Sequence, residues 1–213
     1  MSYGIILIKI LPVKYASEFL DGNIYFNTDE FFTKIDSNDL VRSDVHEGID
    51  ESRQVQSIAI ANDLGEYIPI GGIINPVTFR YGNKDKINIL CMYGYNNKVN
   101  TSFDTVNLSF GDTSIIITDA KAFISRLQVA ANKLGKTLNH GPIEYVDKEK
   151  YDGAMGPFKK FNSHKEQNEF RFVLSKSDGE PIKLNIGDIR DITMVSKTSE
   201  IKYIPKNLSL SKT

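Results

Sequence analysis

The first third of the chain alternates apolar runs with short polar breaks, which predicts strands separated by small helices. The run from Ile5 to Leu11 predicts a buried first strand, and 23–27 predicts a second strand. Between them, residues 12–20 predict a short helix, because Pro12 suits a first helical position. Thr28-Asp29-Glu30 then supplies a cap and first-turn acids for a helix through Phe31, Phe32 and Ile35.

The middle of the chain predicts short β segments and one long helix. Turn residues separate the apolar segments 57–61, 67–70, 77–81 and 86–93, which we expect to form one antiparallel sheet. A continuous apolar run at 114–118 predicts a buried strand. Asp119 caps a helix over 120–134 that ends at Gly135. Its predicted buried stripe consists of Phe123, Leu127, Ala130, Ala131 and Leu134.

The last third returns to strands, at 143–146, 169–174 and 182–186. A turn at 177–179 predicts that the last two of these are antiparallel neighbours, and 189–195 adds an edge. The pattern indicates an α+β fold with a mostly antiparallel, twisted sheet, one long helix and two or three short helices. We expect a single domain over residues 1–196 and a polar C-terminal tail over 197–213.

Composition excludes several classes of function. The 213 residues carry 26 Lys plus Arg against 27 Asp plus Glu, so no global field attracts nucleic acid. Lys9 and Pro12 interrupt the first apolar run far short of a membrane span. The lone Cys91 forms neither an internal disulfide nor a cysteine zinc site, which predicts a cytoplasmic protein. The three histidines, His46, His140 and His164, lack metal-ligand spacing. Only His164, just before the strand at 169, merits a functional test.

The segment 160–172 is the best candidate for a working surface, because a polar loop becomes an alternating strand there. Alternation predicts that Gln167, Glu169 and Arg171 share one face while Phe170 and its apolar neighbours anchor the other. The alternative is a half-exposed strand face whose charges support each other by less than about 1 kcal/mol.

Two further regions carry candidate binding groups. In the polar loop 42–48, Arg42, Asp44 and Glu47 are candidates either for ligand contact or for a salt bridge that fixes the backbone. Tyr25 is a candidate site residue or a half-buried boundary aromatic. We expect any site where the second strand, this loop and the strand at 167–171 meet. Binding residues there would include Asn27 and, for an anion, Lys160.

An ordered series of motifs resembles a family of hypothetical proteins of bacteria and their phages. The resemblance spans nearly the whole chain, and it implies no established activity. A larger family of unknown function, with a late Glu-x-Glu-x-Arg strand, is more loosely similar; here Gln167 replaces the first Glu. The motifs are Gly22-Asn23-Ile24-Tyr25-Phe26-Asn27, Arg42-Ser43-Asp44 with Glu47-Gly48, Ile89-Leu90-Cys91-Met92-Tyr93, Phe110-Gly111-Asp112, Phe158-Lys159-Lys160, Gln167-Asn168-Glu169-Phe170-Arg171 and Ile186-Gly187-Asp188-Ile189.

The chain also resembles the ADP-ribosyltransferase fold, a split antiparallel sheet that binds NAD between its halves. The resemblance implies Lys9 as the first-strand group, Tyr25 as the stacking residue for nicotinamide and Glu169 as the acid. Gln167 would orient the acceptor, and the carboxylate would stabilise an oxocarbenium-like ribose. The Arg or His usual on the first strand of that fold is replaced here by Lys9.

Two hypotheses follow. In the first, the protein acts by binding a host or phage protein, through sheet edges and the loop 42–48. In the second, it is an NAD-using enzyme with Glu169, Gln167 and Tyr25 as catalytic residues, and Glu169→Gln abolishes its activity with little loss of stability. Neither hypothesis uses a metal or a membrane. Convergence of Lys9, Tyr25 and Glu169 on one cleft would favour the enzyme.

Overall fold

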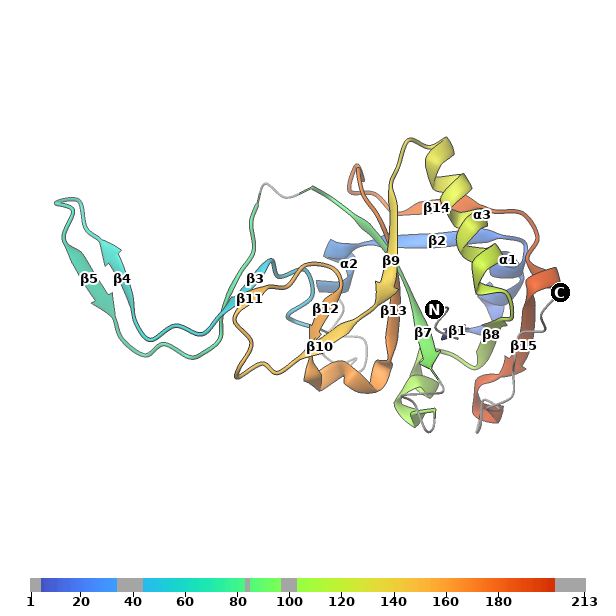
Figure 1. The fold of residues 1–213 in the computed structure, drawn as a ribbon, viewed down its shortest axis with the longest axis horizontal. Coiled ribbons are helices and arrows are strands. Elements are labelled where there is room, and N and C mark those ends of the chain that lie inside the picture. Colours follow the sequence, from blue (N-terminus) through green and yellow to red (C-terminus); the bar gives the residue numbers. More distant parts are fainter. Residues whose placement is uncertain (1–4, 34–43, 83–84, 97–102, 202–213) are drawn as a thin grey trace.

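The computed structural model describes residues 5–33, 44–82, 85–96 and 103–201. The fold is α+β with mostly antiparallel sheets and few helices. A long two-stranded arm, formed by β4 (Ile58–Ala61), β5 (Tyr67–Ile70) and the segments that join them to the body, projects from it (Figure 1). The longest described helix has 14 residues, and none of the described helices has the length and apolar character needed to cross a membrane.

The main sheet is forked. Strands β9 (Leu138–Pro142), β13 (Glu169–Leu174) and β7 (Asn88–Asn96) lie side by side and antiparallel. On its other edge β7 pairs with two strands in succession. Residues 93–96 pair with β1 (Ile5–Leu11), and residues 88 and 89 pair with β2 (Asn23–Thr28). The registers therefore give residues 90–92 of β7 a partner in β13 but none in β1 or β2.

Each branch of the fork continues into further antiparallel strands. β1 leaves β7 after Ile8 and pairs through Leu11 with β8 (Thr113–Ile117), which pairs with the edge strand β15 (Thr193–Lys197). β2 pairs with the edge strand β14 (Ile182–Asn185). The predicted pairing of the strands at 169–174 and 182–186 is therefore wrong. The burial of β13 explains this result. β13 is buried along its whole length and therefore lies inside the sheet, with β7 on one edge and β9 on the other.

Short helices join the branches, and one longer helix covers the sheet. Between β1 and β2 lie η1 (Val13–Tyr15) and α1 (Ala16–Leu20), and α2 (Asp29–Thr33) follows β2. The hydroxyl oxygen of Thr28 accepts from the amide of Phe31 at 3.1 Å, as its cap role predicts. The remaining 3₁₀ segments are η2 (Thr105–Phe110), η3 (Asn162–Gln167), η4 (Arg190–Ile192) and η5 (Thr198–Glu200).

Helix α3 (Ala120–Lys133) begins at Asp119, whose carboxylate accepts from the amide of Ala122 at 2.9 Å. Four of the five predicted stripe residues are buried in it, but Leu134 is 55% exposed. Leu134 follows the last helical residue, in the C-cap position, and so its side chain leaves the buried face.

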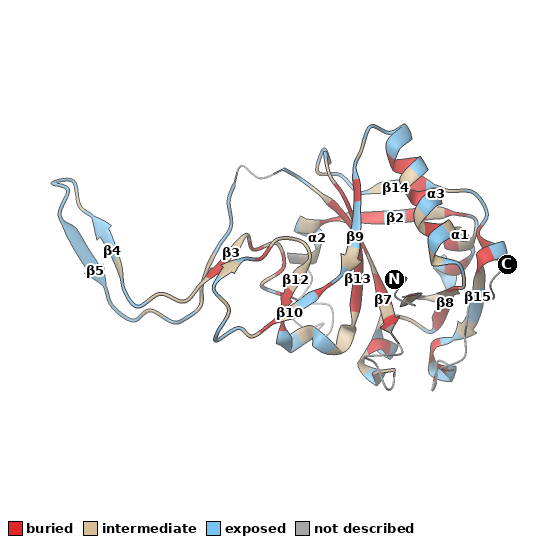
Figure 2. Cartoon of the chain, in the orientation of Figure 1, coloured by how far each residue is buried: buried red, intermediate tan, exposed pale blue. Residues whose placement is uncertain are grey.

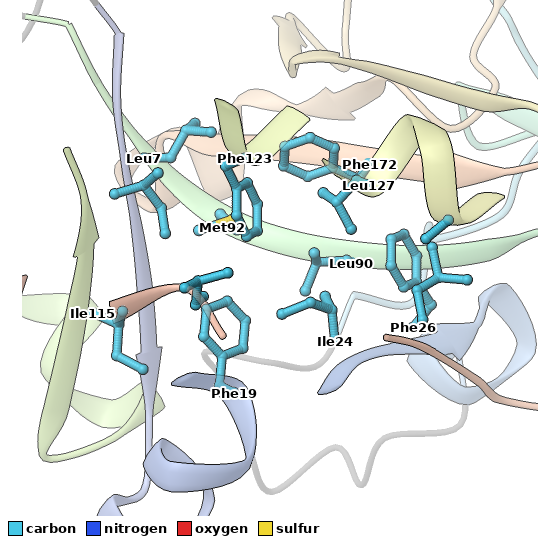
Figure 3. Close-up of a cluster of buried hydrophobic side chains, with 14 of the residues drawn as sticks. Leu7, Phe19, Ile24, Phe26, Leu90, Met92, Ile115, Phe123, Leu127 and Phe172 are labelled. Atoms are coloured by element: carbon cyan, nitrogen blue, oxygen red, sulfur yellow. The ribbon is translucent and has the colours of Figure 1, made fainter. Parts of the chain in front are cut away.

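The main core lies between one face of the forked sheet and helices α1 and α3. Phe19 and Phe123 stack there with centroids 6.2 Å apart, and Phe172 meets Phe123 edge to face (Figure 3). Alternate residues of β2 and β7, such as Ile24 and Leu90, point into this core. Burial of each such side chain stabilises the fold by about 1.5–3 kcal/mol. The neighbouring residues of these strands therefore point to the opposite face.

The middle β segments do not form the single sheet that the sequence predicts. β4 (Ile58–Ala61) and β5 (Tyr67–Ile70) pair only with each other. β6 (Val77–Phe79) pairs with β3 (Glu51–Arg53), which pairs with β11 (Gly153–Ala154). β7 alone joins the main sheet. β10 (Glu144–Val146) pairs in parallel with β12 (Lys159–Phe161). Beside this pair lies a small separate core of Ile49, Val146, Met155 and Phe161.

The end of the chain packs on the body further than the predicted tail boundary implies. Thr198 and Ile201 are buried, and Ile201 lies against the core on the second face of β1. The hydroxyl of Thr198 bonds that of Ser114 at 3.0 Å. Residues 202–213 of the predicted tail lie outside the described residues.

Candidate functional site

The fork encloses a cavity of about 380 Å³ on the face of the sheet opposite α3. Tyr25 and Asn27 of β2 line it, because they alternate with the core residues Ile24 and Phe26. Cys91 of β7 lies on the floor, between the two branches. The other lining residues are Lys9, Ile10, Leu11, Pro12, Phe31, Phe32, Glu47, Ile89, Leu90, Met92, Tyr93, Asn107, Phe110, Lys160, Gln167, Glu169 and Arg171.

Lys9 lies in the gap between the branches. It follows Ile8, the last residue of β1 that pairs with β7. Its ammonium group donates to the backbone carbonyl of Cys91 at 2.9 Å. That carbonyl belongs to the stretch of β7 that has no partner in β1 or β2, so the lysine provides a donor where the strands separate.

Arg171 is the best-satisfied charged group of the site. Its Nε donates to Glu169 at 2.7 Å, and its two terminal nitrogens donate to the two carboxylate oxygens of Glu47 at 2.7 and 2.6 Å. Further bonds reach the carbonyl of Pro157 at 2.9 Å and Glu169 Oε2 at 3.3 Å. These five bonds use all five guanidinium donors. Arg171 therefore holds the site together and has no donor left for a ligand.

Lys160 is the second buried cation. Its ammonium group lies 3.0 Å from Glu169, 3.5 Å from Glu47 and 3.6 Å from Asp44, and it donates to the amide oxygen of Gln167 at 3.2 Å. Burial alone would lower its pKa, but the surrounding carboxylates raise the pKa above the usual value for lysine. Lys160 therefore stays charged, and its charge compensates the surrounding carboxylates.

Asp44 lies behind this cluster and does not line the cavity. Burial opposes its charged form, but His164, 3.5 Å away, and Lys160 lower the pKa of Asp44 to about 2. His164, which the sequence marks as worth testing, is therefore a partner of this carboxylate. Glu47 and Asp44 are both buried, whereas Val45 between them is 67% exposed.

Glu169 and Cys91 face the cavity as a charged acid and a neutral thiol. Burial opposes ionisation of Glu169, but Arg171 and Lys160 hold the pKa of its carboxyl far below its usual range. Burial and the charge of Glu169 raise the pKa of Cys91. The carboxylate of Glu169 accepts two hydrogen bonds from Arg171, at 2.7 and 3.3 Å, and its Oε2 lies 3.0 Å from the ammonium group of Lys160. Both of its oxygens therefore face a cation.

The predicted working face differs from the structure in two ways. Glu169 and Arg171 are buried, at 7% and 1% exposure, so the description as a half-exposed face with weak surface charges is wrong. Gln167 lies outside the strand, at the end of η3, because Asn168 takes a left-handed conformation with φ 41° before β13 begins. The 44–50 and 157–161 segments fold against this face, where the Glu47 carboxylate and the Pro157 carbonyl accept from Arg171.

The structure brings most of the predicted site residues together. The cavity lining includes Lys9, Tyr25, Asn27, Glu47, Lys160, Gln167, Glu169 and Arg171. Asp44 joins them indirectly, through Lys160, and Arg42 lies outside the described residues.

Sequence reasoning missed three groups at this site. Asn107 of η2 is buried and donates to the carbonyls of Asp104 and Glu166 at 3.1 and 3.0 Å. Tyr145 accepts from the amide of Glu169 at 2.9 Å through its hydroxyl. The third residue is Cys91, whose apolar sequence neighbours gave no indication that it faces a cavity. These residues come from remote segments, so spacing along the chain does not reveal them.

Comparisons with known proteins returned no match, whether to a protein-family model, to a curated protein or to a solved structure. The two resemblances drawn from the motifs remain predictions from the sequence. In the described part of the chain, no group of three or more His, Cys, Asp or Glu side chains is arranged to hold a metal ion.

Proposed function

We propose that this protein binds a small organic molecule with a planar ring in the cavity of the forked sheet. The observation that carries the proposal is the cavity itself, whose volume of about 380 Å³ falls within the range of small-molecule sites, about 300–1,000 Å³. The cavity combines an apolar floor with a few convergent polar groups, which is the usual composition of such sites.

The aromatic residues at the cavity favour a ring. Tyr25 and Phe31 line it and are 46% and 49% exposed, so each offers an aromatic surface that a planar ligand would cover. Asn27 and Gln167 supply amide groups, and Lys9 supplies a positive charge. A ligand with a ring, a carboxamide and an anionic group would match all of them.

NAD has these three features, and it is the ligand that the ADP-ribosyltransferase resemblance implies. Lys9, Tyr25 and Glu169 line the same cavity, which supports NAD as the first candidate. Both oxygens of Glu169 already face the cations Arg171 and Lys160, which argues for binding rather than catalysis, because stabilising an oxocarbenium ion requires a carboxylate lone pair for the ribose hydroxyl. Catalysis would require Glu169 to exchange one of its present partners for the substrate.

A thermal-shift titration tests the proposal, with NAD, nicotinamide and ADP-ribose as separate ligands. A ligand that binds only the folded state stabilises it by about 2.7 kcal/mol at a hundred times its Kd, so Tm rises with concentration. Tyr25→Ala should lose most of the shift, because it removes the stacking surface from a half-exposed position. Tyr67→Ala on the arm, at a 77% exposed position, is the matched control and should retain the shift.

The outcomes separate the ligand from the site. A flat response to millimolar NAD and both of its halves would reject NAD. A flat response to a broad panel of nucleotides and aromatic metabolites would reject the cavity as a ligand site. Release of nicotinamide, measured by chromatography, would show that the glycosidic bond breaks and that water or an acceptor bonds to the ribose carbon, and catalysis would then replace simple binding.

The binding of another macromolecule remains a second proposal. The inward position of Asp44 and Glu47 removes the described acids of the predicted contact loop from any partner. The projecting arm, by contrast, is mostly exposed, and none of its residues from 56 to 75 is buried (Figure 2). Any protein contact is therefore better supported at the arm than at the loop.

A further inference from the structure

Hydrogen bonds fix both ends of the arm, its tip and its stem. At its tip, the side-chain oxygen of Asn62 accepts from the amides of Leu64 and Glu66 at 3.0 and 2.9 Å. At its stem, Asn75 accepts from the amide of Val55 at 3.0 Å and donates to its carbonyl at 2.9 Å. Between these points, β4 and β5 pair with each other and with no other described strand. The arm thus has hydrogen-bonded ends, but no third described strand joins its two-stranded sheet.

One face of the arm is a cluster of four isoleucines. The register places Ile58 opposite Ile70 and Ile60 opposite Ile68, and alternation directs all four side chains to the same side. Ile60, Ile68 and Ile70 are 60%, 56% and 43% exposed. An isolated two-stranded hairpin is only marginally stable in water, and a contiguous apolar face on such a hairpin marks an interaction site.

Charge limits what covers this face. From Gln54 to Phe79 the only charged residues are Asp63 and Glu66, both at the tip. The arm therefore has no cation to hold nucleic acid, anionic lipid or an acidic peptide. Its partner must offer an uncharged apolar surface, and the same face on a second copy of the chain is such a surface.

The pattern of the face suits a two-fold contact. Both strands contribute isoleucines in opposed pairs, so two copies related by a two-fold axis stack isoleucine on isoleucine and bury no charge. Arms that point in opposite directions also keep the Asp63 and Glu66 carboxylates of the two copies apart. In that orientation Leu64 at one tip reaches the stem of the other copy near Ile74, and these residues are 83% and 87% exposed.

Area requires the whole arm to take part. A standard interface buries about 800 Å² per partner, more than four isoleucines on a short hairpin provide. The eleven residue steps from Arg53 to Leu64 span about 36 Å at about 3.3 Å per residue, so two antiparallel arms overlap well beyond the isoleucine cluster. We propose that this protein forms a two-fold dimer in which the arms of two copies stack antiparallel through their isoleucine faces.

Sedimentation and light scattering on the full chain test the dimer. The expected wild-type mass at micromolar concentration is twice the 24.0 kDa of the chain. Ile60→Lys with Ile68→Lys places four like charges at the centre of the contact and should yield a folded monomer, because both residues are exposed and contribute to no core of the body. Ala59→Lys with Tyr67→Lys adds the same charges to the opposite face of the arm and should leave the dimer intact.

A cysteine pair tests the direction of the arms. Under mild oxidation, Leu64→Cys with Ile74→Cys should form a covalent dimer, whereas wild type, whose single Cys91 lies half-buried on the floor of the cavity, should not. Crosslinking by Leu64→Cys alone would show parallel arms and overturn the antiparallel arrangement. A monomer at all concentrations, or a dimer that the Ile60 and Ile68 lysines do not affect, would overturn the proposal. Binding of the wild-type arm to neutral lipid vesicles in place of self-association would also overturn it.

Discussion

At the scale of single residues, the buried charges of the fork are the feature with the largest predicted effects. Five groups form the cluster, two cations and three carboxylates: Arg171, Lys160, Glu169, Glu47 and Asp44. Such a cluster is stable because every member has partners, not because ion pairs are strong in themselves. Removal of one charge leaves its buried partners uncompensated.

Glu169→Gln should therefore lower the free energy of unfolding by about 3–5 kcal/mol, because Arg171 and Lys160 lose a shared carboxylate. This replaces the sequence-based expectation that the substitution leaves stability nearly unchanged. Urea unfolding monitored by circular dichroism measures the change. Glu144→Gln removes an exposed carboxylate 3.7 Å from Lys159 and should change stability by less than about 1 kcal/mol. Equal effects of the two substitutions would show that the cluster is not structural.

Asp44 predicts a specific loss of stability in acid. Its folded pKa of about 2 lies below its unfolded value of 3.8, so its contribution is complete above about pH 4 and is lost as pH falls toward 2. The shift corresponds to about 2 kcal/mol. Asp44→Asn should be less stable than wild type at pH 7 but should lose about 2 kcal/mol less on acidification, in urea unfolding at pH 7, 4 and 2.5. Asp63→Asn, at the exposed arm tip, should keep the acid dependence of wild type.

At the scale of elements, local patterns predicted the strands and helices well, and their partners poorly. The first strand, the strand at 169–174 and the helix with its Asp119 cap follow from alternation and capping, which act within a few residues. Pairing depends on contacts between remote segments. Nothing in residues 177–179 indicates that the strands on either side separate, one to β7 and the other to β2.

The candidate site shows the same division. The residue types at 167–171 identified a polar face, and Lys9 and Tyr25 entered through a resemblance. Burial was not predictable, since the segments that cover Glu169 and Arg171 carry Glu47 and Pro157, distant in sequence. An exposed charged strand and a buried ion cluster have the same local pattern, so only the tertiary fold distinguishes them.

At the scale of the whole molecule, the cavity and the arm are two structurally separate features of one chain. The cavity depends on the fork of the main sheet, whereas β4 and β5 belong to no described sheet but their own. Val55 and Asn75 close the stem with two hydrogen bonds, so the chain enters and leaves the arm at neighbouring points (Figure 1). The arm is therefore removable in principle without altering the path of the body.

A variant in which an Asn-Gly turn replaces residues 57–73 should fold with nearly the Tm of wild type, because the deleted residues add no side chain to the described cores. It should be monomeric, and it should retain any Tm shift that a cavity ligand produces in wild type. Differential scanning fluorimetry and sedimentation measure these properties together. Loss of the fold would show that the arm stabilises the body. A dimer without the arm would place the contact between copies on the body, and loss of the ligand response alone would link the arm to the cavity.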